Sequence, residues 1–181
     1  MRYISMVLFA AFCVTSQAQS FENALKPDFR ALYPNQHKVK VYDSLITDVQ
    51  ESGLSYVYQK QLYYAIDDAG AAQLQSITFD YDPLSAWVDI RKAIIIRKDG
   101  NHEVIDSTNV YDYPQPARMI YWGARQKMVE AGKLNAGDAL YIELFRKGFT
   151  YALLQTDDDK YIPPMRGHYY DIVKFQESFP V

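Results

Sequence analysis

The chain has 181 residues, a formal net charge of −3 and a single cysteine, Cys13. This length suits one domain that can bury a hydrophobic core. Its weak acidity is spread along the chain, whereas nucleic-acid-binding proteins usually carry a basic stripe, so we exclude a nucleic-acid partner. Aromatic residues make up 15% of the sequence, with 16 tyrosines, and tyrosine favours strands.

An apolar run near the N-terminus predicts a secretory signal peptide. Arg2 precedes an apolar segment from Ile4 to Val14, and the small residues Ser16 and Ala18 have the spacing of a cleavage site. The apolar segment is shorter than the roughly 20 residues needed to span a bilayer. We therefore predict a signal peptide at residues 1–18 and a periplasmic or secreted protein with no transmembrane segment after cleavage.

Cys13 lies inside this predicted signal peptide. Phe12 stands where a small residue would precede a lipidated cysteine, so we expect a soluble exported protein and not a lipoprotein. Cleavage would leave a mature chain that forms no disulfide and has no thiol nucleophile. Export without disulfides is typical of a bacterial envelope protein.

Two strands are predicted after a lead-in segment at residues 19–36. Apolar residues recur at every second position in both, which is the period of a half-buried strand. Gly53 interrupts the pattern and predicts a hairpin between the strands. The apolar positions are Val39, Val41, Leu45 and Val49 in the first strand, and Leu54, Tyr56, Tyr58, Leu62, Tyr64 and Ile66 in the second.

A short helix and a second hairpin are predicted next. The segment DDAGAAQLQSI, residues 67–77, has helix-forming residues, although Gly70 weakens the pattern. In WVDIRKAIIIRKDGNHEVIDS, residues 87–107, the dipeptide Asp99–Gly100 supplies the positive backbone angle of a tight hairpin turn. One face of the first strand of this hairpin is predicted to carry Val88, Ile90, Ile94 and Ile96.

The remaining sequence predicts further strands. Residues from Ala124 to Leu134 combine helix-forming side chains with preceding aromatics, so helix and strand both stay open there. A turn from Asn135 to Asp138 leads into a long strand of alternating residues. Many strands and few helices predict a mainly β fold over residues 37–181. We expect an antiparallel β-sandwich with one or two short helices, incomplete at its C-terminal end.

No motif predicts a catalytic residue, a metal or a cofactor. His102 and Glu103 begin like the zinc-protease motif H-E-x-x-H, but the fifth position is Asp106. On a strand, residues four apart also lie roughly 13 Å from each other, too far to share a metal. Acidic stretches at residues 79–83 and 156–161 lack the spacing of a calcium-binding loop, so we interpret them as solvated turns.

A hydrolase with a dispersed catalytic site is one further reading. It requires a histidine within hydrogen-bond reach of a carboxylate and a nucleophile, and His168 with Asp171 is the local pair to inspect. Nothing in the sequence marks such a site, so we predict that the chain is not an enzyme.

Two aromatic clusters remain as candidates for ligand binding. Tyrosines on a half-buried strand usually pack in a core, yet exposed rings could stack on sugars, so both readings stay open. Arg166 and His168 lie beside the second cluster and could contact an anionic ligand. The clusters are Tyr111, Tyr113, Tyr121 and Trp122, and Tyr161, Tyr169, Tyr170 and Phe175. The candidate ligand-binding residues are Trp122, Tyr121, Arg166, His168, Tyr169 and Tyr170.

Three segments resemble the domain of unknown function 3857 family, which precedes transglutaminase-like domains in exported proteins of Bacteroides-like bacteria. They are VDIRKAIIIRKDG, IYWGARQKMVEAGKLNAGDALYIELFRKGFTYALL and YIPPMRGHYYDIVKFQESFPV. The resemblance covers Ser55 to Val181. None of these segments is a catalytic signature.

The resemblance implies a β-sandwich accessory domain that recognises something for a transglutaminase-like domain. That downstream domain would use a Cys, His and Asp set, for which this chain offers no counterpart. We therefore expect a non-catalytic N-terminal part of a longer protein. Its expected partners are a transglutaminase-like domain, a protein strand that completes the sheet, and a glycan or peptide ligand. A carbohydrate-binding β-sandwich that uses exposed Tyr and Trp residues is the alternative.

Overall fold

The computed structural model describes residue 21 and residues 23–50, 54–115, 123–149, 153–154 and 161–162. The chain divides into two compact units, the first ending at Asn35 and the second beginning at Gln36. In the first unit, Asp28 caps the short helix α2 (Phe29–Leu32), because its carboxylate accepts a hydrogen bond from the Ala31 N–H at 3.2 Å. The second unit contains the strands that the structure describes.

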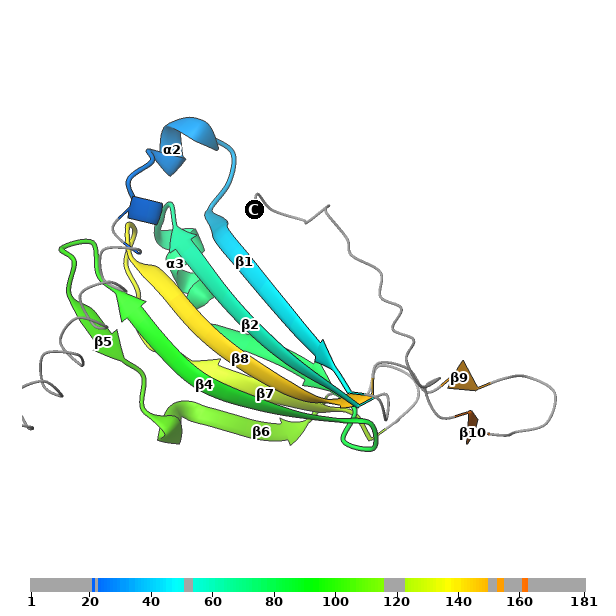
Figure 1. The fold of residues 1–181 in the computed structure, drawn as a ribbon. Helices are drawn as coiled ribbons and strands as arrows, with labels where there is room; N and C mark the ends of the chain where they lie inside the picture. The colour runs from blue at the N-terminus through cyan, green and yellow to red at the C-terminus, as the bar shows by residue number, and fades with distance from the viewer. Residues whose placement is uncertain are drawn as a thin grey trace, which may run out of the picture. The chain divides into compact units, whose positions relative to one another are not determined.

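The larger of two sheets has five antiparallel strands in the order β1-β2-β8-β4-β5. Figure 1 shows its four long strands side by side. The β1–β2 and β4–β5 hairpins are joined through β8, which pairs with β2 on one side and β4 on the other. The strands are β1 (Lys38–Val49), β2 (Leu54–Ala65), β8 (Ala139–Phe149), β4 (Ala86–Ile96) and β5 (His102–Val104).

The smaller sheet has three antiparallel strands in the order β3-β7-β6. It lies behind the larger sheet in the view of Figure 1. A separate two-stranded ribbon pairs β9 with β10. The remaining elements are β3 (Ser76–Tyr81), β7 (Arg125–Glu130), β6 (Val110–Pro114), β9 (Leu153–Leu154), β10 (Tyr161–Ile162), the helix α3 (Asp68–Leu74) and the 3-10 turn η1 (Ser107–Asn109).

The core lies between the two sheets. Alternate residues of β8 point inward, where β3 and α3 pack against them. Burying each large apolar side chain stabilises the fold by about 1.5–3 kcal/mol. The main cluster contains Tyr63, Ala65, Ala71, Leu74, Ile95, Ala131, Leu134, Leu140 and Ile142, with Ile77 and Phe79 packed against it; a second cluster contains Tyr81, Val88 and Leu144.

Glycines make two of the predicted local structures possible. Gly100 has a φ of 87°, the positive angle that the turn between β4 and β5 requires. Gly70 lies in the first turn of α3, close to the backbone of His37, and a Cβ there would lie 1.8 Å from the His37 carbonyl oxygen. The predicted helix thus contains Gly70 because no other residue fits at this contact.

A β-bulge overturns one prediction about β4. The register shifts between Ile90 and Lys92, and the extra residue reverses the face that each following side chain takes. Val88 and Ile90 therefore line the core, whereas Ile94 and Ile96 turn to the opposite face of the sheet. The prediction that these four residues share one face is wrong.

A second bulge lies in β1, between Lys40 and Tyr42. It places Val39 on the opposite face from Leu45 and Val49, which follow the bulge. The common face predicted for these apolar residues is therefore also wrong.

The fold class predicted from the sequence is confirmed: the chain is mainly β, with two antiparallel sheets and few short helices. In the segment that stayed open, residues 125–130 form the strand β7 at the centre of the smaller sheet. The predicted incompleteness at the C-terminal end falls on residues outside the described part of the chain.

Replacing Gly148 by alanine is expected to destabilise the sheet by about 2 kcal/mol, the usual range for overpacking. A Cβ at this position would lie 2.5 Å from the Ser85 carbonyl oxygen and 2.8 Å from the Ala86 Cα, so the β3–β4 turn would have to move. Urea denaturation followed by circular dichroism measures the change. Lys60→Ala, at an exposed position of β2, is the control and is expected to change stability by less than about 0.5 kcal/mol.

Candidate functional site

The outer face of the five-stranded sheet carries a group of aromatic side chains. In the antiparallel ladders, Tyr58 lies opposite Phe145, and Tyr56 and Trp87 both lie opposite Lys147. Directly opposite residues share a face, and the intervening residues point into the core. These rings therefore face away from the smaller sheet. We refer to Tyr56, Tyr58, Trp87 and Phe145 as the aromatic face.

Phe145 is the centre of the aromatic face and is 7% exposed. Its ring centroid lies 5.1 Å from that of Tyr58, at an interplanar angle of 48°. Tyr56 stacks on it at 6.1 Å and 14°, and Trp87 meets it edge-on at 6.1 Å and 70°. Trp87 and Tyr58 are 50% and 46% exposed, so about half of each side chain meets solvent. The rings are held in place by Phe145 but are tilted about it and do not form one flat plane.

The polar atoms of these rings have no partner in the part of the chain that the structure describes. This applies to the hydroxyl groups of Tyr56 and Tyr58 and to the indole N–H of Trp87. Such groups offer a bound molecule two hydroxyls and one N–H donor beside apolar ring surface.

An open pocket of about 530 Å³ adjoins the aromatic face at Trp87. It lies between the β3–β4 turn and the end of β8, and its size falls in the range of small-ligand pockets. Leu84 at its rim is 91% exposed. The pocket is lined by Leu54, Pro83, Leu84, Ser85, Ala86, Trp87, Lys147 and Gly148.

Two cations flank the aromatic face. The Arg91 guanidinium lies 4.3 Å from the Phe145 centroid, and its Nε pairs with Asp89 Oδ2 at 2.9 Å. The Lys147 Nζ lies 5.8 Å from the centroid of Tyr56. Both contacts are of the cation–π type, which contributes about 0.5–1 kcal/mol at exposed sites.

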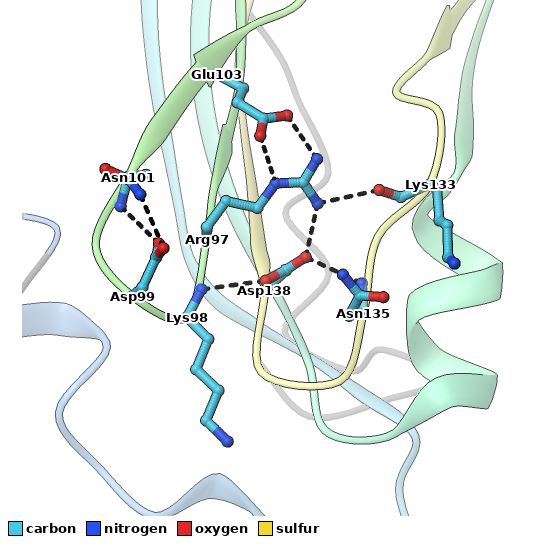
Figure 2. A network of polar contacts seen from close by, with 8 residues as sticks. All are labelled: Arg97, Lys98, Asp99, Asn101, Glu103, Lys133, Asn135 and Asp138. Carbon is cyan, nitrogen blue, oxygen red and sulfur yellow. Dashed lines mark hydrogen bonds and ion pairs between the residues drawn. The ribbon is translucent and has the colours of Figure 1, made fainter.

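The densest polar network joins the β4–β5 hairpin to the loop before β8 (Figure 2). Arg97 donates to Glu103 through Nε at 2.9 Å and to Asp138 through Nη1 at 2.8 Å. The Asp138 carboxylate also accepts hydrogen bonds from the backbone N–H of Asn135 at 2.9 Å and of Lys98 at 3.1 Å. These groups satisfy one another, so we interpret the network as a structural clamp between two loops.

A second polar group lies on the inner side of the smaller sheet. Asp112 accepts hydrogen bonds from the Tyr81 hydroxyl at 2.8 Å and from Arg125 Nε at 2.8 Å, and it pairs with Lys127 at 3.0 Å. Burial alone would raise the pKa of Asp112, but these hydrogen bonds outweigh it and hold the pKa below its usual value. The carboxylate is thus a fixed anion that ties the three strands together.

The candidate binding residues predicted from the sequence lie outside the described residues, as does the His168–Asp171 pair. Of the first aromatic cluster, Tyr111 and Tyr113 are described and lie on β6. Tyr113 donates a hydrogen bond to the Met128 sulfur at 3.2 Å, and a hydrogen bond to Glu130 raises the pKa of Tyr111. Outside the described part are Trp122, Tyr121, Arg166, His168, Tyr169 and Tyr170.

The described histidines do not assemble a catalytic group. His37 Nδ1 lies 2.7 Å from Asp67 Oδ2, and Asp67 also caps α3. His102 is exposed on β5, next to the Glu103 that binds Arg97. In the described ranges, no three His, Cys, Asp or Glu residues are placed to hold one metal ion. The helices described here are all too short or too polar to cross a membrane.

Two packed antiparallel sheets with an exposed aromatic face define a β-sandwich domain. The chain belongs to the DUF3857 family, described as a domain of unknown function with a solved structure, whose model matches residues 51–181. This match confirms the family resemblance of the sequence. No curated protein matches the chain.

Three solved structures match part of the chain. One is the crystal structure of a "putative protease" from Parabacteroides distasonis, with a TM-score of 0.55, 11% identity, and coverage of 62% of this chain but 23% of that protein. The chain thus corresponds to a small part of that protein, and the low identity makes this a likeness of fold alone.

The other two are carbohydrate-binding modules from the Clostridium thermocellum scaffoldin CipA. The CBM3a-L domain gives a TM-score of 0.37 at 13% identity, covering 63% of this chain and 68% of that one. The family 3a carbohydrate-binding module gives 0.35 at 14%, covering 60% and 74%. TM-scores this low carry no argument about binding.

Proposed function

We propose that this chain is an exported, non-catalytic recognition domain that binds a glycan on its aromatic face. We also propose that it acts beside a transglutaminase-like domain, as the sequence resemblance implies. The export part of the proposal is supported by the predicted signal peptide at residues 1–18. The recognition part is supported by the geometry of the outer face.

One observation carries the proposal: Trp87 and Tyr58 are both about half-exposed and both rest on Phe145. They lie on β4 and β2, on either side of β8, so about two inter-strand spacings, roughly 10 Å, separate them. Two rings at that separation can contact different sugar units of one chain. An exposed ring of this kind combines apolar stacking surface with a polar group at its edge, which suits the apolar faces and hydroxyl groups of a sugar.

Rigidity further supports a binding role. Both rings project from long paired strands, and the buried Phe145 limits their rotation. A preorganised surface loses little conformational entropy when a ligand binds. The non-catalytic part is supported by the two polar groups around Asp138 and Asp112. In both, the carboxylates and the cations pair with one another and hold loops or strands together.

Isothermal titration calorimetry of the purified chain with neutral and acidic oligosaccharides tests the proposal. We expect at least one saturable, 1:1 interaction with a glycan of several units, and weaker binding of its monosaccharide because only one ring can then be engaged. If the chain bound peptides but none of the glycans, the proposed ligand class would be contradicted. Absence of any glycan binding would contradict the recognition role itself.

A further inference from the structure

We propose that the pocket beside Trp87 takes the carboxylate of an acidic sugar, which Lys147 binds, so that the domain prefers glycans containing uronic acids. This inference rests on the proposed function, because it names the class of glycan that the aromatic face would bind. It is carried by the charge and the shape of the pocket.

Among the residues that the structure describes around the pocket, Lys147 is the charged one. The other lining residues are apolar or small. Lys147 is exposed and the pocket is open, so a charge pair with a bound anion would be modest and would weaken as salt is added. The apolar lining residues of the pocket could contact the apolar face of a sugar ring.

Lys147 has no acidic partner in the described part of the chain. It lies opposite Tyr56 and Trp87 in the sheet, and its Nζ makes a cation–π contact with the ring of Tyr56. Asp48 lies opposite Tyr56 on β1, two strands away from Lys147, and forms no ion pair with it. The charge of Lys147 is therefore available to a ligand.

Two of the acids on the same face of the sheet as the aromatic rings are engaged. Asp89 pairs with Arg91 at 2.9 Å, and Glu143 accepts a hydrogen bond from the Tyr141 hydroxyl at 2.7 Å. Arg91 is fixed by Asp89 and by its contact with Phe145, so it serves to hold the rings. Neither acid holds Lys147, which is the cation of this face that also lines the pocket.

The pocket and the aromatic face meet at Trp87, which belongs to both. A sugar ring stacked on Trp87 would bring its substituents to the pocket, where Lys147 lies directly opposite Trp87 in the ladder. An acidic sugar would contact both residues at once, because its ring would stack on Trp87 and its carboxylate would pair with Lys147. A neutral sugar would use the ring alone, and an acidic peptide such as poly-glutamate would use the charge alone.

The test compares oligogalacturonate with a neutral cello-oligosaccharide of equal length, using calorimetry at low and at physiological salt. We expect the acidic glycan to bind about fivefold more tightly at low salt, and the preference to shrink as salt screens the pair. Lys147→Gln is expected to remove the preference, so that the acidic and the neutral glycan bind with equal affinity. Lys60→Gln, another exposed lysine on this face of the sheet, is the matched control and should keep the preference.

The outcomes separate this inference from the proposed function. Equal binding of the two glycans, or a preference that survives in Lys147→Gln, would overturn the inference and leave glycan binding intact. Poly-glutamate that binds as tightly as oligogalacturonate would also overturn it, because charge alone would then explain the selectivity. Failure of both glycans to bind would refute the proposed function and this inference with it.

Discussion

Replacing Asp138 by alanine is expected to lower the free energy of unfolding by about 3 kcal/mol, the usual cost of breaking a buried ion pair. The Asp138 side chain is 4% exposed and accepts hydrogen bonds from Arg97, Asn135 and Lys98. Its removal leaves one N–H of the Arg97 guanidinium and two backbone N–H groups without this acceptor, although Arg97 keeps Glu103. Urea denaturation measures the change. A loss below about 1 kcal/mol would show that water replaces the carboxylate and that the clamp in Figure 2 contributes little.

The same network predicts a pH dependence. Burial alone would raise the pKa of Asp138, but hydrogen bonds from Asn135, Arg97 and Lys98 outweigh it and hold the pKa below its usual value. A carboxyl group whose pKa is lowered by folding stabilises the protein above its ordinary pKa, near 3.9, and loses that contribution as the pH falls through the lowered value. The stability difference between the natural chain and Asp138→Asn should therefore be largest near pH 7 and shrink below about pH 4. A difference that stays constant down to pH 2.5 would exclude this charge effect.

Replacing Trp87 by alanine is expected to weaken glycan binding by roughly 30-fold, or about 2 kcal/mol, as for other central aromatic anchors. The substitution removes the stacking surface shared by the aromatic face and the pocket, and the indole N–H with it. Stability should change little, because half of the side chain is already exposed to solvent. Calorimetry with the tightest-binding glycan measures the loss.

Tyr111→Ala is the matched control for this substitution. Tyr111 is 40% exposed, similar to Trp87, but it lies on β6 of the smaller sheet. Its replacement should leave the affinity within twofold of the natural chain. If Tyr111→Ala weakened binding and Trp87→Ala did not, the binding surface would lie on the smaller sheet, near the first aromatic cluster seen in the sequence.

Much of the fold could be predicted because its signals are local. The dipeptide Asp99–Gly100 is sufficient for the β4–β5 turn, and alternation reveals β2 and β8. The faces of β1 and β4 could not be predicted, since each strand contains a bulge whose position depends on the register with its partner strand, β2 for β1 and the distant β8 for β4. The local sequence also does not decide between helix and strand at residues 125–130, because this strand forms by pairing with β3 and β6.

The candidate site was harder to predict than the fold. The alternation of apolar and polar residues predicted that Tyr56 and Tyr58 share one face of a strand. A strand whose tyrosines are buried in a core has the same sequence pattern, so the pattern does not show that these rings are exposed. The signal that distinguishes them is long-range: β8 brings Phe145 between Tyr58 and Trp87. Only the sheet order β2-β8-β4 shows that these rings form one surface.

The most direct test of the recognition role is a nuclear magnetic resonance titration that follows the two indole N–H signals of the chain. The sequence contains two tryptophans, Trp87 and Trp122, so Trp87→Phe assigns both signals. On addition of the glycan that binds best, the Trp87 signal should shift in a saturable way with the same Kd as calorimetry. A Trp87 signal that stays unchanged while the glycan binds would contradict a binding site on the aromatic face.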